Sequence, residues 1–141
     1  MSAFHLEFTV EGNNFVSAGS ASDEVKNTLK QLGIPPTTIR RVAIAMYEGE
    51  INMVIHAGGG KAFVDIFNDR IVIVLRDTGK GIENIELAMQ DGYSTAPDNI
   101  RAMGFGAGMG LPNMLKYTDK FNIKSEVGKG TELTLQVNFE Q

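Results

Sequence analysis

Three polar side chains recur at four-residue spacing in the first half of the sequence: Glu48, Asn52 and His56. On an α-helix this spacing puts them on one stripe, each turned by about 40° from the one before. A carboxylate and a carboxamide one turn apart suit a hard divalent cation, because Asn supplies an oxygen ligand and Glu can polarise a hydroxyl or a water. A solvated helix face would show the same pattern, so the stripe alone leaves both interpretations open.

Two neighbours of this stripe carry expectations of their own. Glu50 lies about 200° round the helix from Glu48, so we expect it to face away and to matter little for activity. Gly49 costs about 1 kcal/mol relative to Ala inside a helix. The helix is therefore either locally weak or tightly packed at Gly49.

A second candidate is the turn Asp77-Thr78-Gly79-Lys80-Gly81, which directly follows the aliphatic run 71–75. Its two glycines let the backbone turn sharply and approach a ligand closely. The Asp77 carboxylate can accept a hydrogen bond from an exocyclic amine such as that of adenine. An ordinary strand-to-helix turn is the alternative.

A third candidate is the glycine-rich run 104–111, GFGAGMGL, which precedes a predicted helix. Free N–H groups at the start of a helix favour phosphate. The run is not a dinucleotide fingerprint, because the third glycine of G-x-G-x-x-G would fall on Met109 or Leu111. The Gly-Lys pairs of the chain also lack the surrounding residues of a P-loop. A mobile linker is the alternative.

Periodicity indicates the elements that must position these groups. Alternating apolar and polar residues, or runs rich in β-forming residues, predict five strands, at 4–10, 63–67, 71–75, 121–126 and 131–139. Helical signals predict helices at 20–32, 35–57, 82–90 and 111–118. Ser20, Ser22 and Asp23 are candidate N-caps of the first helix, and residues 91–108 form an irregular stretch. The order predicts an α+β fold, a two-layer sandwich whose mostly antiparallel sheet is covered by helices on one face.

Composition limits the class of protein. The chain has 141 residues, of which 43% are hydrophobic and 21% charged, which fits a single domain over residues 1–141. The net charge of −4 argues against broad nucleic-acid binding, and the lack of Cys excludes a disulfide scaffold, a thiolate zinc site and a Cys nucleophile. We find neither a secretion signal nor a membrane span, and we expect a cytoplasmic protein.

The chain resembles the Bergerat-fold ATPases (the GHKL or HATPase_c superfamily) through boxes in a shared order: Glu48-x3-Asn52, Asp77-x-Gly79-x-Gly81, the alternating glycines and Gly128-Lys129-Gly130-Thr131. Residues 85–95 and 108–112 look most like the small serine kinases of bacterial partner switching, the RsbT and RsbW type. No phosphoacceptor helix pair precedes these boxes and no transducer domain follows them, which favours this subgroup.

The resemblance implies a site for ATP and Mg²⁺. Glu48 would be the general base and Asn52 the Mg²⁺ ligand. Asp77 would contact the adenine amine, braced by Thr131, while Gly79 and Gly81 let the backbone approach the base. Lys80 could meet a phosphate. The lid and phosphate cradle would be formed by Gly104, Gly106, Gly108, Met109, Gly110 and Leu111.

The implied activity is that of an ATP-dependent serine/threonine protein kinase, a phosphotransferase acting on a Ser or Thr of a STAS-type antagonist protein. A sigma factor or a downstream phosphatase would be a further partner, and a homodimer fits the subgroup. No nucleic acid or membrane is implied. Three alternatives stay open: a non-catalytic ATP- or ADP-binding switch, a detached histidine-kinase catalytic domain, and simple ATP hydrolysis.

Overall fold

The computed structural model describes residues 4–12, 18–89 and 110–139. The strands in these residues are β1 (Phe4–Glu11), β2 (Gly59–Ile66), β3 (Arg70–Arg76), β4 (Lys120–Glu126) and β5 (Gly130–Asn138). The helices are α1 (Ser20–Gln31), α2 (Pro36–His56), α3 (Ile85–Ala88) and α5 (Gly110–Lys116). The predicted irregular stretch 91–108 lies outside the described residues.

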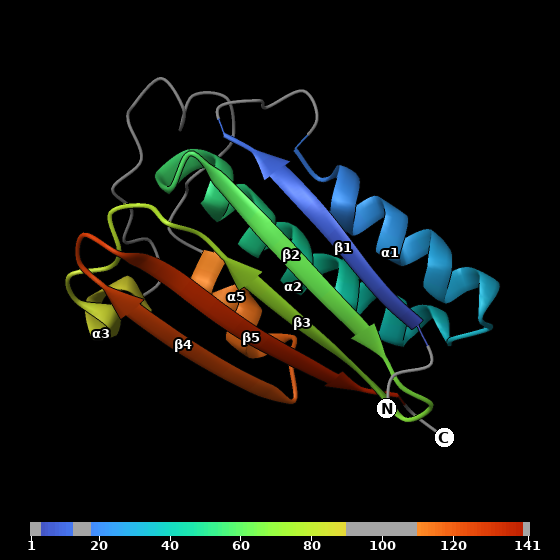
Figure 1. The fold of residues 1–141 in the computed structure, drawn as a ribbon. Helices are drawn as coiled ribbons and strands as arrows, with labels where there is room; N and C mark the ends of the chain where they lie inside the picture. Colours follow the sequence, from blue (N-terminus) through green and yellow to red (C-terminus); the bar gives the residue numbers. More distant parts are fainter. Residues whose placement is uncertain (1–3, 13–17, 90–109, 140–141) are drawn as a thin grey trace.

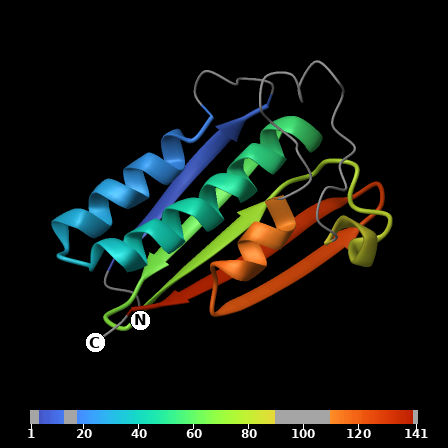
Figure 2. The ribbon, with the colours of Figure 1, turned by 180° about the vertical axis from the view of Figure 1, so that it is seen from behind.

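The strands form one sheet in the order β1-β2-β3-β5-β4, and every neighbouring pair is antiparallel. Helices α1, α2 and α5 lie on one face of this sheet (Figures 1 and 2). Alternate residues of β3 explain why: Ile71, Ile73 and Leu75 are buried beneath the helices, whereas Val72 and Val74 on the other face are only half-buried. The predicted α+β architecture is confirmed.

Strand β2 begins four residues earlier than predicted. Gly59 and Gly60 pair with Glu11 and Val10 of β1 instead of only ending the preceding helix. Gly59 has a φ of 103°, and a Cβ on it would lie 2.2 Å from the carbonyl oxygen of Val10. Close contact between two backbones therefore requires glycine here, and the strand starts inside the glycine run.

Helix α1 does not use the predicted N-caps Ser20, Ser22 and Asp23. Its N-cap is Gly19, which makes no side-chain capping bond. The carboxylate of Glu50, on α2, accepts the N–H of Gly19 at 2.9 Å and both the N–H and the hydroxyl of Ser22 at 3.0 and 2.7 Å. Glu50 is only 2% exposed, so a buried carboxylate from another helix caps α1.

Helix α3 is shorter than the predicted 82–90. It spans Ile85–Ala88, and its N-cap Asn84 accepts the N–H of Leu87 at 3.0 Å. The N–H of Ile82 instead donates to the Ser125 hydroxyl of β4 at 2.8 Å. That bond holds Ile82 outside the helix.

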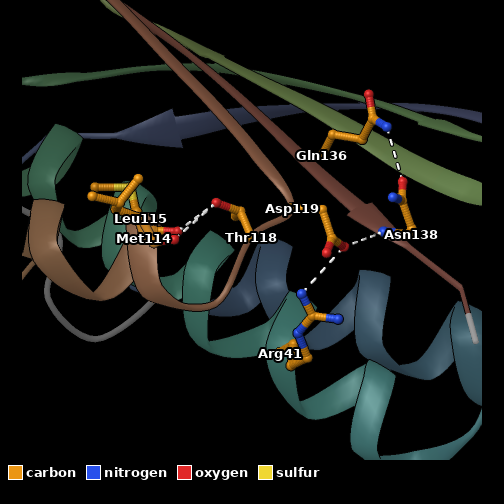
Figure 3. A network of polar contacts seen from close by, with 7 residues as sticks. All are labelled: Arg41, Met114, Leu115, Thr118, Asp119, Gln136 and Asn138. Atoms are coloured by element: carbon orange, nitrogen blue, oxygen red, sulfur yellow. Dashed lines mark hydrogen bonds and ion pairs between the residues drawn. The ribbon is translucent and has the colours of Figure 1, made fainter.

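The C-terminal end of α5 is fixed to α2 through the turn that follows it (Figure 3). Thr118 Oγ1 donates to the carbonyl of Met114 at 2.8 Å. Asp119 Oδ2 accepts the N–H of Asn138 at 2.7 Å and pairs with Arg41 Nη2 at 3.2 Å. Arg41 lies on α2, so this network holds α5 against both α2 and the sheet.

Across residues 4–12, 18–89 and 110–139, we find no helix with the length and apolar character needed to cross a bilayer.

Candidate active site

Helix α2 carries the predicted stripe. Glu48, Asn52 and His56 all lie on α2, and all three are half-buried rather than fully solvated. A Cβ on Gly49 would lie 2.1 Å from Leu75 Cδ1 of β3. Of the two interpretations of Gly49, tight packing is therefore correct, and glycine lets α2 lie close to the sheet beneath the stripe.

The Asp77 turn, which follows β3, is held by the neighbouring strand β5. Asp77 Oδ1 accepts the N–H groups of Gly79 at 3.0 Å and Thr131 at 3.1 Å. In return, the N–H of Asp77 donates to the Thr131 carbonyl at 2.9 Å. Thr131 thus braces Asp77 through its backbone, at the position where the sequence predicted a bracing residue.

The two glycines of this turn serve close packing within the protein. A Cβ on Gly79 would lie 2.7 Å from Ala57, at the C-terminal end of α2. Gly81 has a φ of 78°, and a Cβ on it would lie 2.4 Å from the carbonyl of Glu126. The sequence analysis assigned both glycines to the approach of a base, which stays a prediction; the structure shows that they bring the turn against α2 and the β4–β5 hairpin.

Ser125 is a site residue that sequence reasoning missed. Its hydroxyl accepts the N–H of Ile82, bonds Thr131 Oγ1 at 2.8 Å and donates to the Gly130 carbonyl at 3.2 Å. The alternation of β4 contained a signal, since Ser125 is a polar residue on the half-buried face that also holds Phe121 and Ile123. Ser125 joins the Asp77 turn to the β4–β5 hairpin.

Helix α5 brings the end of the glycine run to the stripe. A Cβ on Gly110 would lie 3.1 Å from both the Nδ2 and Oδ1 atoms of Asn52, so the α5 backbone lies directly against that carboxamide. Leu111, by contrast, is 7% exposed and belongs to the hydrophobic core. Any part that Leu111 plays in a ligand site would be through its backbone.

Asn113 is a second residue that the sequence did not reveal. Its Nδ2 donates to Glu48 Oε1 at 3.4 Å, and both side chains are half-buried. No local pattern indicates this contact, because 65 residues separate the two positions.

Lys80 lies near enough to His56, at the end of α2, for its charge to act on the imidazole. Burial, and to a smaller extent the positive charge of Lys80, hold the pKa of His56 below its ordinary value of 6.5. His56 is therefore neutral at neutral pH, and Lys80 itself is exposed. An exposed ammonium at this end of α2 could contact an anionic ligand.

These contacts bring the described parts of the predicted site to one place, the C-terminal half of α2. The Asp77 turn reaches it at Ala57, and α5 reaches it at Asn52. Gly104, Gly106, Gly108 and Met109 lie outside the described residues. Within the described ranges, no group of three or more His, Asp or Glu side chains could hold a metal ion.

Comparison with known proteins identifies the class. Residues 25–141 match the family described as histidine kinase-, DNA gyrase B- and HSP90-like ATPases. The match covers well over half of the chain, so the chain belongs to this family, the HATPase_c family. The predicted Bergerat-fold relationship is confirmed.

Individual relatives show which members of this family the chain is similar to. The chain is 32% identical over 112 residues to the serine/threonine-protein kinase RsbT of Bacillus subtilis, covering 77% of this chain and 78% of RsbT. It is 33% identical over 129 residues to an anti-sigma F factor of Clostridium acetobutylicum, covering 88% and 82%. A solved Mycobacterium tuberculosis protein with RsbU and RsbW domains shares the fold, with a TM-score of 0.66 at 14% identity over 99% of this chain and 33% of that one.

These relatives confirm the functional class that the sequence predicted. The chain is an ATPase-family domain of the kind found in the serine kinases and anti-sigma factors of partner switching. ATP as the nucleotide follows from the family.

Proposed function

We propose that this protein transfers the γ-phosphate of ATP to a Ser or Thr hydroxyl of a partner protein, using Glu48, Asn52 and Asp77. The observation that carries the proposal is the convergence of the Asp77 turn and α5 on the C-terminal half of α2. Phosphoryl transfer needs positioning and charge neutralisation more than covalent help from the protein, and such a convergence supplies positioning.

Asp77 is the proposed contact for the adenine amine. Both of the hydrogen bonds that it accepts within the described residues end on Oδ1. We assign Oδ2 to the amine, with the N–H groups of Gly79 and Thr131 fixing the direction of the carboxylate. Because the turn is held by the protein's own N–H groups, the acceptor would be oriented before the base arrives.

Asn52 is the proposed protein ligand for Mg²⁺. Its half-buried carboxamide provides an oxygen donor, and the close approach of Gly110 restricts where the carboxamide can lie. Mg²⁺ commonly binds through one or two protein oxygens and completes its shell with phosphates and waters, so the donor set fits this ion. When bound, Mg²⁺ would neutralise charge on the phosphates.

Glu48 is the proposed general base. The acceptor hydroxyl would give its proton to the Glu48 carboxylate while its oxygen bonds to the γ-phosphorus. The bond from the γ-phosphorus to the β–γ bridging oxygen breaks, and ADP leaves with that electron pair. Lys80, Gly110 and the predicted lid residues Gly104, Gly106, Gly108 and Met109 are proposed to contact the phosphates.

The proposed substrate is an antagonist protein of the STAS fold, with a sigma factor or a downstream phosphatase as a second partner. This part of the proposal is supported by the kinase and the anti-sigma factor among the relatives. We propose that the protein works in the cytoplasm, as one domain over residues 1–141 built on the single core that the described elements share.

The direct test is phosphoryl transfer from radiolabelled ATP with Mg²⁺ to STAS proteins encoded near the gene, comparing the native chain with Glu48→Gln. We expect an acid-stable phosphoserine or phosphothreonine, and a loss of transfer of about 10²- to 10⁴-fold in Glu48→Gln with ATP affinity unchanged. Glu24→Gln, an exposed change on α1, is the matched control.

Other outcomes would favour the alternatives. ATP binding with no transfer to any STAS protein would indicate a nucleotide-dependent switch. An acid-labile product on a histidine would indicate a histidine-kinase catalytic domain. Native transfer by Glu48→Gln would show that the base is a different residue.

A further inference from the structure

Helices α2 and α5 face each other along the predicted stripe. Gly110 lies against Asn52, and Asn113, one turn later on α5, lies against Glu48, one turn earlier on α2. The two helices therefore run antiparallel, as Figure 2 also shows. Residues three apart on α5 and four apart on α2 share one helix face, so one interface contains both contacts.

We propose that Asn113 is a positioning residue that orients the Glu48 carboxylate for phosphoryl transfer; the inference rests on the proposed role of Glu48 as general base. Asn113 Nδ2 donates to Glu48 Oε1 at 3.4 Å. This distance is long for a hydrogen bond, as is common for catalytic contacts before substrate binds. One bonded carboxylate oxygen leaves the other to take the proton of the acceptor hydroxyl.

The chemistry of an amide suits this task. A carboxamide donates a hydrogen bond without carrying charge, so it fixes the carboxylate but forms no ion pair that would compete for it. A Lys or Arg at this position would hold the carboxylate more strongly and weaken it as a base. Both side chains are half-buried, which limits competition from water.

Packing and an ion pair hold α5 in place, and with it the Asn113–Glu48 contact. Met114, the next residue, is fully buried, and its Sδ would lie 3.3 Å from a Cβ on Gly49. At the far end, the Arg41–Asp119 pair fixes the turn after α5 to α2. Asn113 is thus presented to Glu48 by a helix anchored at both the core and its C-terminal turn.

The kinetic test compares Asn113→Leu and Asn113→Asp in the transfer assay. Leu is similar in size but donates no hydrogen bond, and Asp replaces the donor with a second carboxylate. We expect kcat to fall about tenfold in Asn113→Leu and further in Asn113→Asp, with ATP affinity and KM for ATP unchanged. Asn122→Leu and Asn122→Asp, at an exposed position on β4, are the matched controls and should transfer at the native rate.

A second measurement, of Tm, tests the Glu48–Asn113 contact independently of enzymatic activity. Asn113→Asp alone should lower Tm, because it places two carboxylates together. The double variant Glu48→Gln/Asn113→Asp exchanges donor and acceptor, so its Tm should recover towards the native value while transfer stays absent. This cycle reports on the Glu48–Asn113 pair whether or not Glu48 is the base.

Native kcat in Asn113→Leu, or Tm losses that simply add in the double variant, would overturn the proposal. If Glu48→Gln alone transferred phosphate at the native rate, the catalytic role of Asn113 would fall together with the proposed base. The Tm cycle would still show whether the two side chains meet, so the two failures are distinguishable.

Discussion

The two sides of the candidate site are built differently. On the base side, where Asp77 would contact the adenine base, the Asp77 carboxylate accepts two backbone N–H groups. There the Ser125 hydroxyl also bonds the N–H of Ile82, which joins the turn to the hairpin, and Thr131 Oγ1 within the hairpin, each at 2.8 Å. On the transfer side, where Glu48 would take the proton, the Glu48 carboxylate accepts one long hydrogen bond from the described part of the chain, from Asn113.

This difference indicates which side of the site determines nucleotide binding and which side determines the rate of transfer. The base side is part of the hydrogen-bonding of the fold, so it would recognise a nucleotide with little rearrangement. The transfer side depends on how two helices lie against each other, so small movements of α5 would change the rate without changing nucleotide affinity. Substitutions on the two sides should therefore separate binding from transfer.

The largest effect is expected from Glu50, which lies on the opposite side of α2 from Glu48 and caps α1. Glu50→Ala removes the acceptor for the buried N-terminus of α1, and we expect a loss of about 3 kcal/mol in the free energy of unfolding. Thermal unfolding should show a Tm about 10 °C lower. Glu24→Ala, exposed on α1, is the control, and an equal Tm in both variants would contradict the capping role.

On the base side, Asp77→Asn should weaken binding and leave the fold intact. The Asn oxygen can still accept the N–H groups of Gly79 and Thr131, but its NH₂ would face the adenine amine as a second donor. We expect the Kd for ATP and ADP in calorimetry to rise about 10- to 100-fold. Asp69→Asn, in the exposed β2–β3 turn, is the control; an unchanged Kd for Asp77→Asn would remove the base pocket from this turn.

Ser125→Ala should give a smaller effect of the same kind. Without the hydroxyl, the N–H of Ile82 loses its acceptor and the turn is held less firmly. We expect a rise of about fivefold in the Kd for ADP, with kcat at saturating ATP preserved. Ser20→Ala, exposed on α1, serves as the control. A fall in kcat with unchanged Kd would place Ser125 on the transfer side and break the comparison.

The smallest effect concerns pH. Because the pKa of His56 is lowered in the folded state, the unfolded chain binds the proton first as the pH falls. The contribution of neutral His56 is therefore complete above about pH 6.5 and is lost as the pH falls towards the lowered value. The free energy of unfolding, measured in urea across this pH range, should fall less towards acid in His56→Gln than in the native chain.

His5 provides the control of opposite sign. The hydrogen bond with Asp65 raises the pKa of His5, so its contribution is present below pH 6.5 and is lost as the pH rises through the raised value. In His5→Gln, the free energy of unfolding should therefore change less with pH above about pH 6.5 than in the native chain. Identical pH profiles for the native chain and His56→Gln would contradict the buried, neutral state of His56.

Much of the fold could be predicted because the determining signals are local. The aliphatic run of β3, the alternation within β5 and the Gly33 stop after α1 each depend on a few neighbouring residues. The stripe Glu48-Asn52-His56 is likewise a property of one helix. Glu50 also faces away from Glu48 as expected, but its orientation did not reveal that it caps α1.

The missed contacts are long-range. Glu50 meets Gly19 across 31 residues, Ser125 meets Ile82 across 43, and Asn113 meets Glu48 across 65. Each contact joins two segments that lie far apart in the sequence. Their pairing depends on how α1, α2, α5 and the hairpin pack together, which no local pattern determines. The shorter α3 has the same cause, because Ile82 bonds to a hairpin that follows it in the chain.

The central claim is that Asp77, Asn52 and Glu48 serve one nucleotide. A crystal structure with Mg²⁺ and a non-hydrolysable ATP analogue tests it most directly. We predict the adenine amine on Asp77 Oδ2, the Asn52 oxygen on the metal and the γ-phosphate on the Glu48 side of α2. An analogue bound elsewhere, or one that leaves Asn52 and Asp77 without contact to metal and base, would contradict the account.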